Sequence, residues 1–250
     1  MNAYWLETKY EFLKLWRMPV YSASTLLYPL GFYVMFGLLL PSSENRFFPM
    51  AQYLLGTYGA FGVIGATIHA LGVTIAVERG MGWMTVKRVS PMPRGAYLGA
   101  KVAVGLAFST LVVLALFALG ASLGGVKRSA MQWTEAGAML VLGSVPFACM
   151  GIAIGRLAGA NSAANLINGI HLPLGFCSGL WFPIGLLPEA LQRVAEWLPY
   201  YHMGQIGLAA MGAPARGSRQ EHFAILAAYT ILFLLITLWA ERRGSERLYG

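Results

Sequence analysis

The stretch Glu78–Lys101, ERGMGWMTVKRVSPMPRGAYLGAK, decides how this chain folds, because it is a charged segment between two long apolar runs. It holds five of the eighteen Lys and Arg residues of the sequence and one acid, Glu78. A basic loop between two membrane spans stays on the cytoplasmic side, since Lys and Arg resist translocation. The stretch therefore predicts a cytoplasmic loop that sets the orientation of the chain. Within it, Ser90-Pro91 is a site where a helix would end, because the residue before proline avoids helical dihedrals.

The composition indicates an integral membrane protein. Of the 250 residues, 57% are hydrophobic and 11% are charged, whereas soluble domains carry about 25% charged residues. The net charge of +8 does not indicate a nucleic-acid partner, because the cations flank apolar runs instead of forming one basic patch. Cys149 and Cys177 lie in apolar runs and read as small buried hydrophobes.

Charge-free intervals predict an all-α membrane protein with six transmembrane helices, because a helix needs about 20 mainly apolar residues to cross a bilayer. Twelve Lys and Arg residues fall on one side of these spans and six on the other, which places both termini in the cytoplasm. We expect a single multi-pass domain, residues 1–250, in the cell (inner or plasma) membrane. The predicted spans cover about residues 21–40, 52–77, 102–123, 136–155, 161–182 and 223–240, and the cytoplasmic loop covers residues 78–101.

Residues 2–17 predict an amphipathic helix that lies in the cytoplasmic interface, with its Trp residues at headgroup depth. The pattern has a charged face and an apolar face, with Lys9 as the exception. The charged face holds Glu7, Glu11, Lys14 and Arg17, and the apolar face holds Trp5, Leu6, Phe12, Leu13 and Trp16.

Residues 178–210 predict a broken, partly re-entrant outer segment between the fifth and sixth spans, because three prolines interrupt it. Non-helical backbone at membrane depth is tolerated only where protein or water covers it. A short amphipathic helix is expected between the bends. Its polar face would hold Glu189, Arg193 and Glu196, and its apolar face would hold Leu187, Leu191 and Val194.

Residues for ATP binding and catalysis are missing from the sequence. A P-loop needs a Lys followed by Ser or Thr, and none of the five Lys residues is followed by either. The four His residues are scattered, so we expect structural roles for them, and no metal-ligand spacing is present. The predicted spans hold no carboxylate at depth, whereas ion-coupled carriers commonly place ionisable groups there. His69 and His171 are the two ionisable candidates.

Two sequence motifs resemble those of type-2 ABC exporter permeases. The first has roughly the form E-x-E-x-G-T-L-E followed by S-P-x-x-R, and the matching residues are Glu78, Gly82, Ser90, Pro91 and Arg94. The second family motif lies between the last two spans, and residues 178–202 of this chain resemble it. They run from Ser-Gly-Leu-Trp-Phe-Pro through Leu187-Pro188 and Leu198-Pro199 to His202. The order of elements agrees as well, so the resemblance covers essentially the whole chain. The first motif departs from the family at Gly80 and Thr85, where acids are frequent, and at Trp83, where Thr is frequent.

The resemblance implies a permease subunit that pairs with a second permease copy, as an expected homodimer, and with two ATP-binding subunits. Those partners would hold ATP and Mg, so this chain is expected to be no enzyme and to bind no cofactor or metal. The implied cargo is hydrophobic or amphipathic: a drug-like molecule, a lipid or a glycolipid. The residues implied to couple to the ATP-binding subunit are Glu78, Arg79, Gly82, Lys87, Arg88, Ser90 and Pro91.

Polar residues recur on one face of the fifth predicted span, at Asn161, Asn165, Asn168 and His171. Such groups are costly against lipid, so they either bond to neighbouring helices or face a wet cavity. In the resembling family the first and fifth spans meet near the dimer axis. That resemblance implies a substrate path lined by Tyr28, Phe32, Asn165, Asn168 and His171.

The GxxxGxxxG ladder of Gly151, Gly155 and Gly159 favours close helix packing within the subunit, with packing across a dimer as the alternative. A second functional hypothesis is a self-sufficient secondary carrier or intramembrane enzyme that depends on His69 or His171. The sequence leaves open the cargo, the direction of transport beyond the resemblance, and whether the dimer is made of identical chains.

Overall fold

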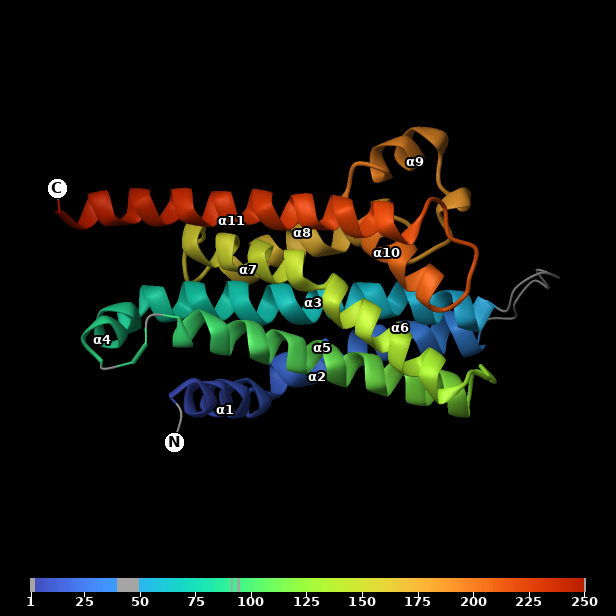
Figure 1. The fold of residues 1–250 in the computed structure, drawn as a ribbon, viewed down its shortest axis with the longest axis horizontal. Coiled ribbons are helices and arrows are strands. Elements are labelled where there is room, and N and C mark those ends of the chain that lie inside the picture. The colour runs from blue at the N-terminus through green and yellow to red at the C-terminus, as the bar shows by residue number, and fades with distance from the viewer. Residues whose placement is uncertain (1–2, 40–49, 91, 94, 250) are drawn as a thin grey trace.

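The structure, a computed structural model, describes residues 3–39, 50–90, 92–93 and 95–249, without the side chains of Arg88 and of residues 243–249. Most of the described residues lie in helices, and none of them lies in a strand (Figure 1). The α-helices are α1 (Ala3–Trp16), α2 (Pro19–Phe32), α3 (Met50–Gly80), α4 (Trp83–Val89), α5 (Ala96–Ser122), α6 (Ala130–Gly143), α7 (Val145–Leu157), α8 (Ala163–Cys177), α9 (Glu189–Ala195), α10 (Pro199–Ala210) and α11 (Arg219–Tyr249). A π-helical stretch (Tyr33–Leu39) continues α2, and a 3₁₀ turn (Ile184–Leu186) precedes α9.

Five helical stretches of the described chain are long and apolar enough to cross a membrane. They are Pro19–Leu39, Met50–Gly80, Ala96–Ser122, Ala130–Leu157 and Arg219–Arg242. The remaining predicted span, residues 161–182, contains α8, which has 15 residues. A helix of that length extends about 22 Å, short of a hydrocarbon core of about 30 Å. The count of six spans and the re-entrant segment therefore stay predictions.

Helix α8 ends earlier than the apolar run because a Schellman motif stops it at Gly179. This glycine has a φ of 72°, a left-handed conformation that glycine adopts without steric cost. The backbone N–H of Leu180 donates to the Gly175 carbonyl at 3.1 Å, and the N–H of Gly179 donates to the Phe176 carbonyl at 3.1 Å. The pair Ser178-Gly179 was the sequence signal for this stop.

Helix α3 runs through the middle of the bundle, and α2, α5, α7, α8 and α10 pack against it (Figure 1). A Cβ added to Gly56 of α3 would lie 2.6 Å from the Gly207 carbonyl oxygen of α10, so the two backbones are in direct contact. A Cβ added to Gly155 of α7 would lie 2.9 Å from the Gly72 carbonyl oxygen of α3, and Gly151 approaches α3 similarly. Packing of the glycine ladder within the subunit is therefore confirmed at these two α7 positions.

Helix α9 forms where a short amphipathic helix was predicted, but its packed face differs by one residue. Ala195 is buried with Ile184, Leu187 and Tyr201 in a small separate core. Val194, which was predicted to lie on the apolar face, is 53% exposed. The prediction was wrong at Val194, because the side chain of Ala195, one residue further along the helix, packs into the small core instead.

Charged residues that the sequence analysis grouped on one side of the membrane meet at one end of the bundle. At the end that carries α1 and α4, Arg79 donates to the Ala158 carbonyl at 2.6 Å, and Arg156 pairs with Glu241 of α11. At the opposite end, Arg128 donates to the Ala210 carbonyl at 2.9 Å. The end of α11 lies at the α1 end, so the chain starts and finishes its described course on the same side (Figure 1).

Candidate functional site

A buried ionic cluster joins α1, α3 and α5 at the end of the bundle that carries α4. Lys101 is 2% exposed, and its Nζ lies 2.6 Å from Glu11 Oε2 and 2.7 Å from Glu78 Oε1. The Tyr97 hydroxyl donates to Glu78 Oε2 at 2.7 Å, and Lys14 also pairs with Glu78. Burial of these charges is tolerated because each one has a partner of opposite sign. The cluster therefore holds three helices in one arrangement.

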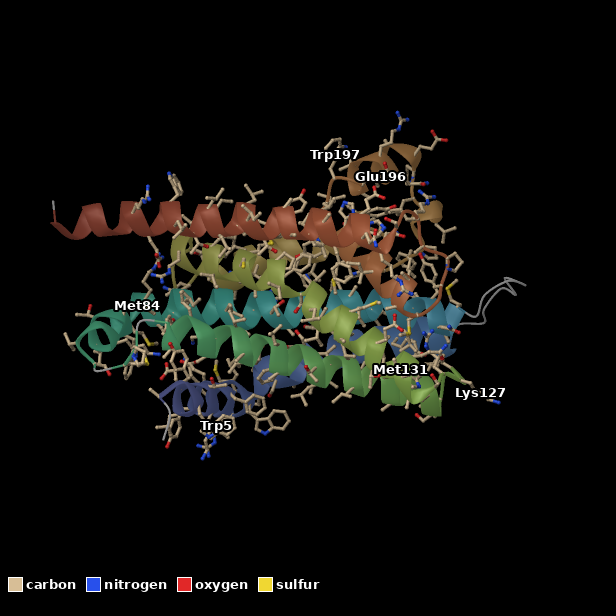
Figure 2. All side chains as sticks on the ribbon, viewed as in Figure 1. Trp5, Met84, Lys127, Met131, Glu196 and Trp197 are labelled. Atoms are coloured by element: carbon tan, nitrogen blue, oxygen red, sulfur yellow. The ribbon has the colours of Figure 1, made fainter. Side chains whose placement is uncertain are left out.

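The charged face of α1 is turned onto the protein, where an interfacial helix alone would turn it toward water. Glu11 and Leu15 are both buried, and Phe12 packs on Phe108 of α5 with ring centroids 5.3 Å apart. Trp5 and Trp16 remain exposed, and Figure 2 shows Trp5 on the outer side of α1. The exposed Trp side chains suit headgroup depth. The burial of Glu11 is a property that the sequence did not reveal, because its partners Lys87 and Lys101 lie 76 and 90 positions away.

Helix α4 is fastened to α1 through Lys87. The Lys87 ammonium lies 2.5 Å from Glu7 Oε1 and 3.5 Å from Glu11 Oε1, and it sits 4.2 Å from the centroid of the Tyr97 ring. Burial lowers the pKa of Lys87, but the hydrogen bond to Glu7 and the charges of Glu78, Glu7 and Glu11 raise it more, so the net direction is upward. Lys87 is therefore charged and engaged within the chain.

The outer face of α4 is apolar. Trp83, Val86 and Val89 follow one another at intervals of three, and they are 50%, 55% and 81% exposed. Gly82, with a φ of 75°, precedes this helix, and Ser90 ends it in an extended conformation. This apolar face was not predicted from the sequence, because the loop was interpreted by its charged residues alone. The spacing of these three residues was the available signal.

The residues predicted to couple to a partner fall into two groups. Glu78, Arg79 and Lys87 bond within the chain, while Gly82 and Ser90 bound the exposed helix α4. The side chain of Arg88 and the whole of Pro91 lie outside the described residues. Among these charged residues, Lys87 is the one that fastens α4 to α1, and the apolar outer face of α4 is exposed.

Two of the predicted path residues belong to one aromatic cluster. The Phe32 ring lies 4.8 Å from the Trp181 ring, Trp181 lies 5.7 Å from Phe61, and Phe61 stacks on His171 at 4.2 Å. His171 is buried, and its Nδ1 lies 3.2 Å from the Tyr200 hydroxyl. Phe32 of α2 and His171 of α8 are thus brought together across α3.

The other predicted path residues lie on exposed faces. The Asn168 amide oxygen lies 3.0 Å from His69 Nε2, so this residue joins α8 to α3 at the edge of the cluster. Asn165 and Tyr28 are exposed on α8 and α2. The structure therefore connects Phe32, Asn168 and His171 with one region, and it places Asn165 and Tyr28 on surfaces that other helices of this chain do not cover.

Trp181 is a member of the aromatic cluster that the sequence analysis did not select. Its indole Nε1 is buried and has no hydrogen-bond partner among the described residues. A buried N–H without a partner is costly, so this donor is available to a molecule that enters the cluster. Its position within the Ser-Gly-Leu-Trp-Phe-Pro motif was the sequence signal.

These features define the class of the protein, a multi-pass all-helical membrane protein that presents helix α4 at one end. Residues 2–211 match the model of the ABC-2 type transporter family, and the chain belongs to that family. It is 26% identical over 245 residues to "Putative transport permease YvfS" of Bacillus subtilis (strain 168), in an alignment that covers 97% of this chain and 98% of that protein. The chain is thus a membrane transport permease subunit. The resemblance inferred from its two motifs is confirmed, and membership implies an ATP-binding partner.

Proposed function

We propose that this chain is the membrane-spanning subunit of an ATP-driven exporter. It pairs with a second copy of itself and with two ATP-binding subunits, which hold ATP and Mg, while this chain holds no cofactor. It moves a hydrophobic or amphipathic cargo, such as a drug-like molecule, a lipid or a glycolipid, out of the cytoplasm. In this proposal the α1 and α4 end is cytoplasmic, in the cell (inner or plasma) membrane.

The apolar outer face of α4 is the observation that carries the proposal. An exposed Trp with two Val residues on one face is the kind of anchor that dominates protein–protein interfaces, and Trp83, Val86 and Val89 supply it. A short helix transmits movement only if it is firmly attached to the spans. Lys87 provides this attachment through Glu7 and Glu11, and Lys101 continues it to Glu78 and α5.

The proposed cargo path follows the exposed faces of α2 and α8 and the aromatic cluster between them. Tyr28 and Asn165 face away from the bundle core, and an amide group in contact with lipid is costly. A second copy placed against these faces would cover them or enclose a wet path. Phe32, His171 and Trp181 would then contact an apolar cargo, and the free indole N–H of Trp181 would bond to a polar group on it.

The test is reconstitution of the chain with its ATP-binding subunit in nanodiscs. We expect Trp83→Ala to weaken assembly by about thirtyfold or more, since an interface anchor contributes about 2 kcal/mol or more, and to abolish cargo-stimulated ATP hydrolysis. The matched control is Met131→Ala, which truncates another exposed apolar side chain at the opposite end of the bundle. Lys87→Glu should preserve Trp83 yet uncouple hydrolysis from cargo, because α4 loses its attachment to α1.

Full assembly and full stimulated hydrolysis in both Trp83→Ala and Lys87→Glu would contradict the docking role of α4. Transport by the purified chain alone, driven by an ion gradient and lost on substitution of His69 or His171, would instead support a self-sufficient carrier. Product release by the chain alone would support an intramembrane enzyme.

A further inference from the structure

Two buried histidines bond to each other at the end of the molecule opposite to α1 and α4. His202 of α10 and His222 of α11 are 4% and 3% exposed, and their Nδ1 atoms lie 2.8 Å apart. Nε2 of His202 lies 3.0 Å from the Glu196 carbonyl oxygen, and Nε2 of His222 lies 2.6 Å from the Arg216 carbonyl oxygen. Figure 2 shows Glu196 at the end of α9, far from Trp5 and Met84. The two rings thus link the end of α9, α10, the following loop and α11 in one chain of hydrogen bonds.

The number of protons in this chain of hydrogen bonds follows from its two ends. A carbonyl oxygen can only accept, so both Nε2 atoms must carry a proton. The contact between the two Nδ1 atoms needs one further proton, because two lone pairs at that distance would repel each other. Two neutral imidazoles carry two protons in total, and the three bonds need three. The pair therefore holds one proton more than two neutral rings.

The surroundings of the pair balance this extra charge. The histidines line a pocket of ≈ 680 Å³ together with Glu196, which directly follows α9, Arg216 of the loop, and Glu221 and Tyr229 of α11. Tyr201 of α10 lies on the same pocket, and Tyr53 of α3 interacts with Tyr201 and Arg216. The exposed carboxylates of Glu196 and Glu221 favour the extra proton on the histidine pair, and the Arg216 guanidinium opposes it.

A second extra proton is disfavoured. Burial and the neighbouring His222 lower the pKa of His202, and these effects outweigh the opposing contributions of Glu196 and Glu221. The one extra proton is therefore shared between the two Nδ1 atoms.

We propose that His202 and His222 form a proton-binding site that locks the outer segment of the protein to its last helix. Loss of the shared proton leaves two donors for three contacts, so one hydrogen bond must break. Either a carbonyl at the end of α9 or in the loop loses its donor, or the two rings separate. The Tyr229 hydroxyl also bonds to the Trp197 carbonyl, so the released end of α9 would keep one link to α11. The site responds to the pH on the side of the membrane opposite to α4, and it does not depend on the proposed cargo or partners.

The direct test is ¹⁵N NMR of the full chain in nanodiscs, with ¹⁵N-labelled histidine assigned through His202→Gln and His222→Gln. At pH 6 we expect three protons on the ring nitrogens of the pair, one on each Nε2 and one shared by the two Nδ1 atoms. On raising the pH, one proton should leave in a single transition. A folded wild-type protein with only two protonated nitrogens in the pair over the whole range from pH 5 to pH 9 would overturn the proposal.

The second test is hydrogen exchange of residues 189–202 at several pH values, corrected for the intrinsic exchange rate. In the wild type we expect protection to fall about tenfold above the transition, as for the loss of one hydrogen bond. His222→Gln keeps a donor for the Arg216 carbonyl but cannot titrate, so its protection should not change with pH. His69→Gln, the control, should keep the wild-type transition. The same transition in His222→Gln as in the wild type would also overturn the proposal.

Discussion

At the scale of single residues, Lys101 contributes most to the organisation of the α4 end. It is the buried cation between Glu11 and Glu78, and it lies at the start of α5 where α1 and α3 also meet. Removal of one partner from a buried ion pair is far more destabilising than replacement of the whole group by apolar residues, because an uncompensated charge is left behind.

We expect Lys101→Met to reduce the free energy of unfolding by about 3–5 kcal/mol, since two buried carboxylates lose a shared partner. Thermal unfolding in detergent, followed by Trp fluorescence, measures the change. Lys9→Met is the matched control on the exposed side of α1 and should have little effect. Adding Glu11→Gln and Glu78→Gln to Lys101→Met should recover most of the loss. No recovery would show that Lys101 acts through packing instead of charge.

Lys87, which fastens α4 to α1, gives a prediction for alkaline pH. Its pKa is raised above the usual 10.5, so its ion pairs with α1 contribute fully below pH 10.5 and are lost as pH rises through the higher folded pKa. We expect residues 83–89 to resist proteolysis at pH 10.5 in the wild type and to become sensitive at still higher pH. Lys87→Met should be sensitive at every pH, and a wild-type transition below pH 10 would contradict the assigned pairing.

At the scale of secondary-structure elements, the contact between α3 and α10 depends on the absence of side chains. Gly56 and Gly207 place the two backbones in contact, and helices in membranes gain stability from such close packing. This contact fixes where α10 lies, and therefore where His202 lies relative to α11.

We expect Gly207→Ala to destabilise the protein by about 1–3 kcal/mol, the usual cost of overpacking, because its Cβ would lie 2.3 Å from the Gly56 carbonyl oxygen. Gly31→Ala in α2 is the control, since nothing lies within 4 Å of its Cβ. That substitution should be neutral or slightly stabilising, as alanine favours helix. The measurement is the midpoint of thermal unfolding, and equal effects of both substitutions would contradict the direct backbone contact.

At the scale of the whole molecule, the bundle has two chemically different ends. One end carries the ionic cluster, α4 and the end of α11, and the other carries α9 and the histidine pair (Figure 1). The excess of Lys and Arg in the segments of the first end predicts that this end faces the cytoplasm.

Cysteine labelling tests this orientation in a background with Cys149→Ser and Cys177→Ser. We expect a membrane-impermeant maleimide to label Leu186→Cys in intact cells, because Leu186 is exposed next to α9. Val89→Cys, exposed at the end of α4, should react only after permeabilisation. The reverse pattern would invert the topology, and labelling of both in intact cells would contradict a location of the two ends on opposite sides.

The all-helical membrane class, the segregation of charges into two ends and the family were predictable from the sequence, and the family resemblance added the short helix of the loop. These properties depend on local hydropathy, on charge and on motif spacing, all of which are readable along one chain. Only the tertiary structure decided that Glu11, Glu78 and Lys87 face inward, that α4 presents Trp83 outward, and that α8 stops at Gly179. It also brought His202 and His222 together. The physical reason is that the direction of a side chain and the partner of a buried charge are set by packing between helices distant in sequence, which no local pattern records.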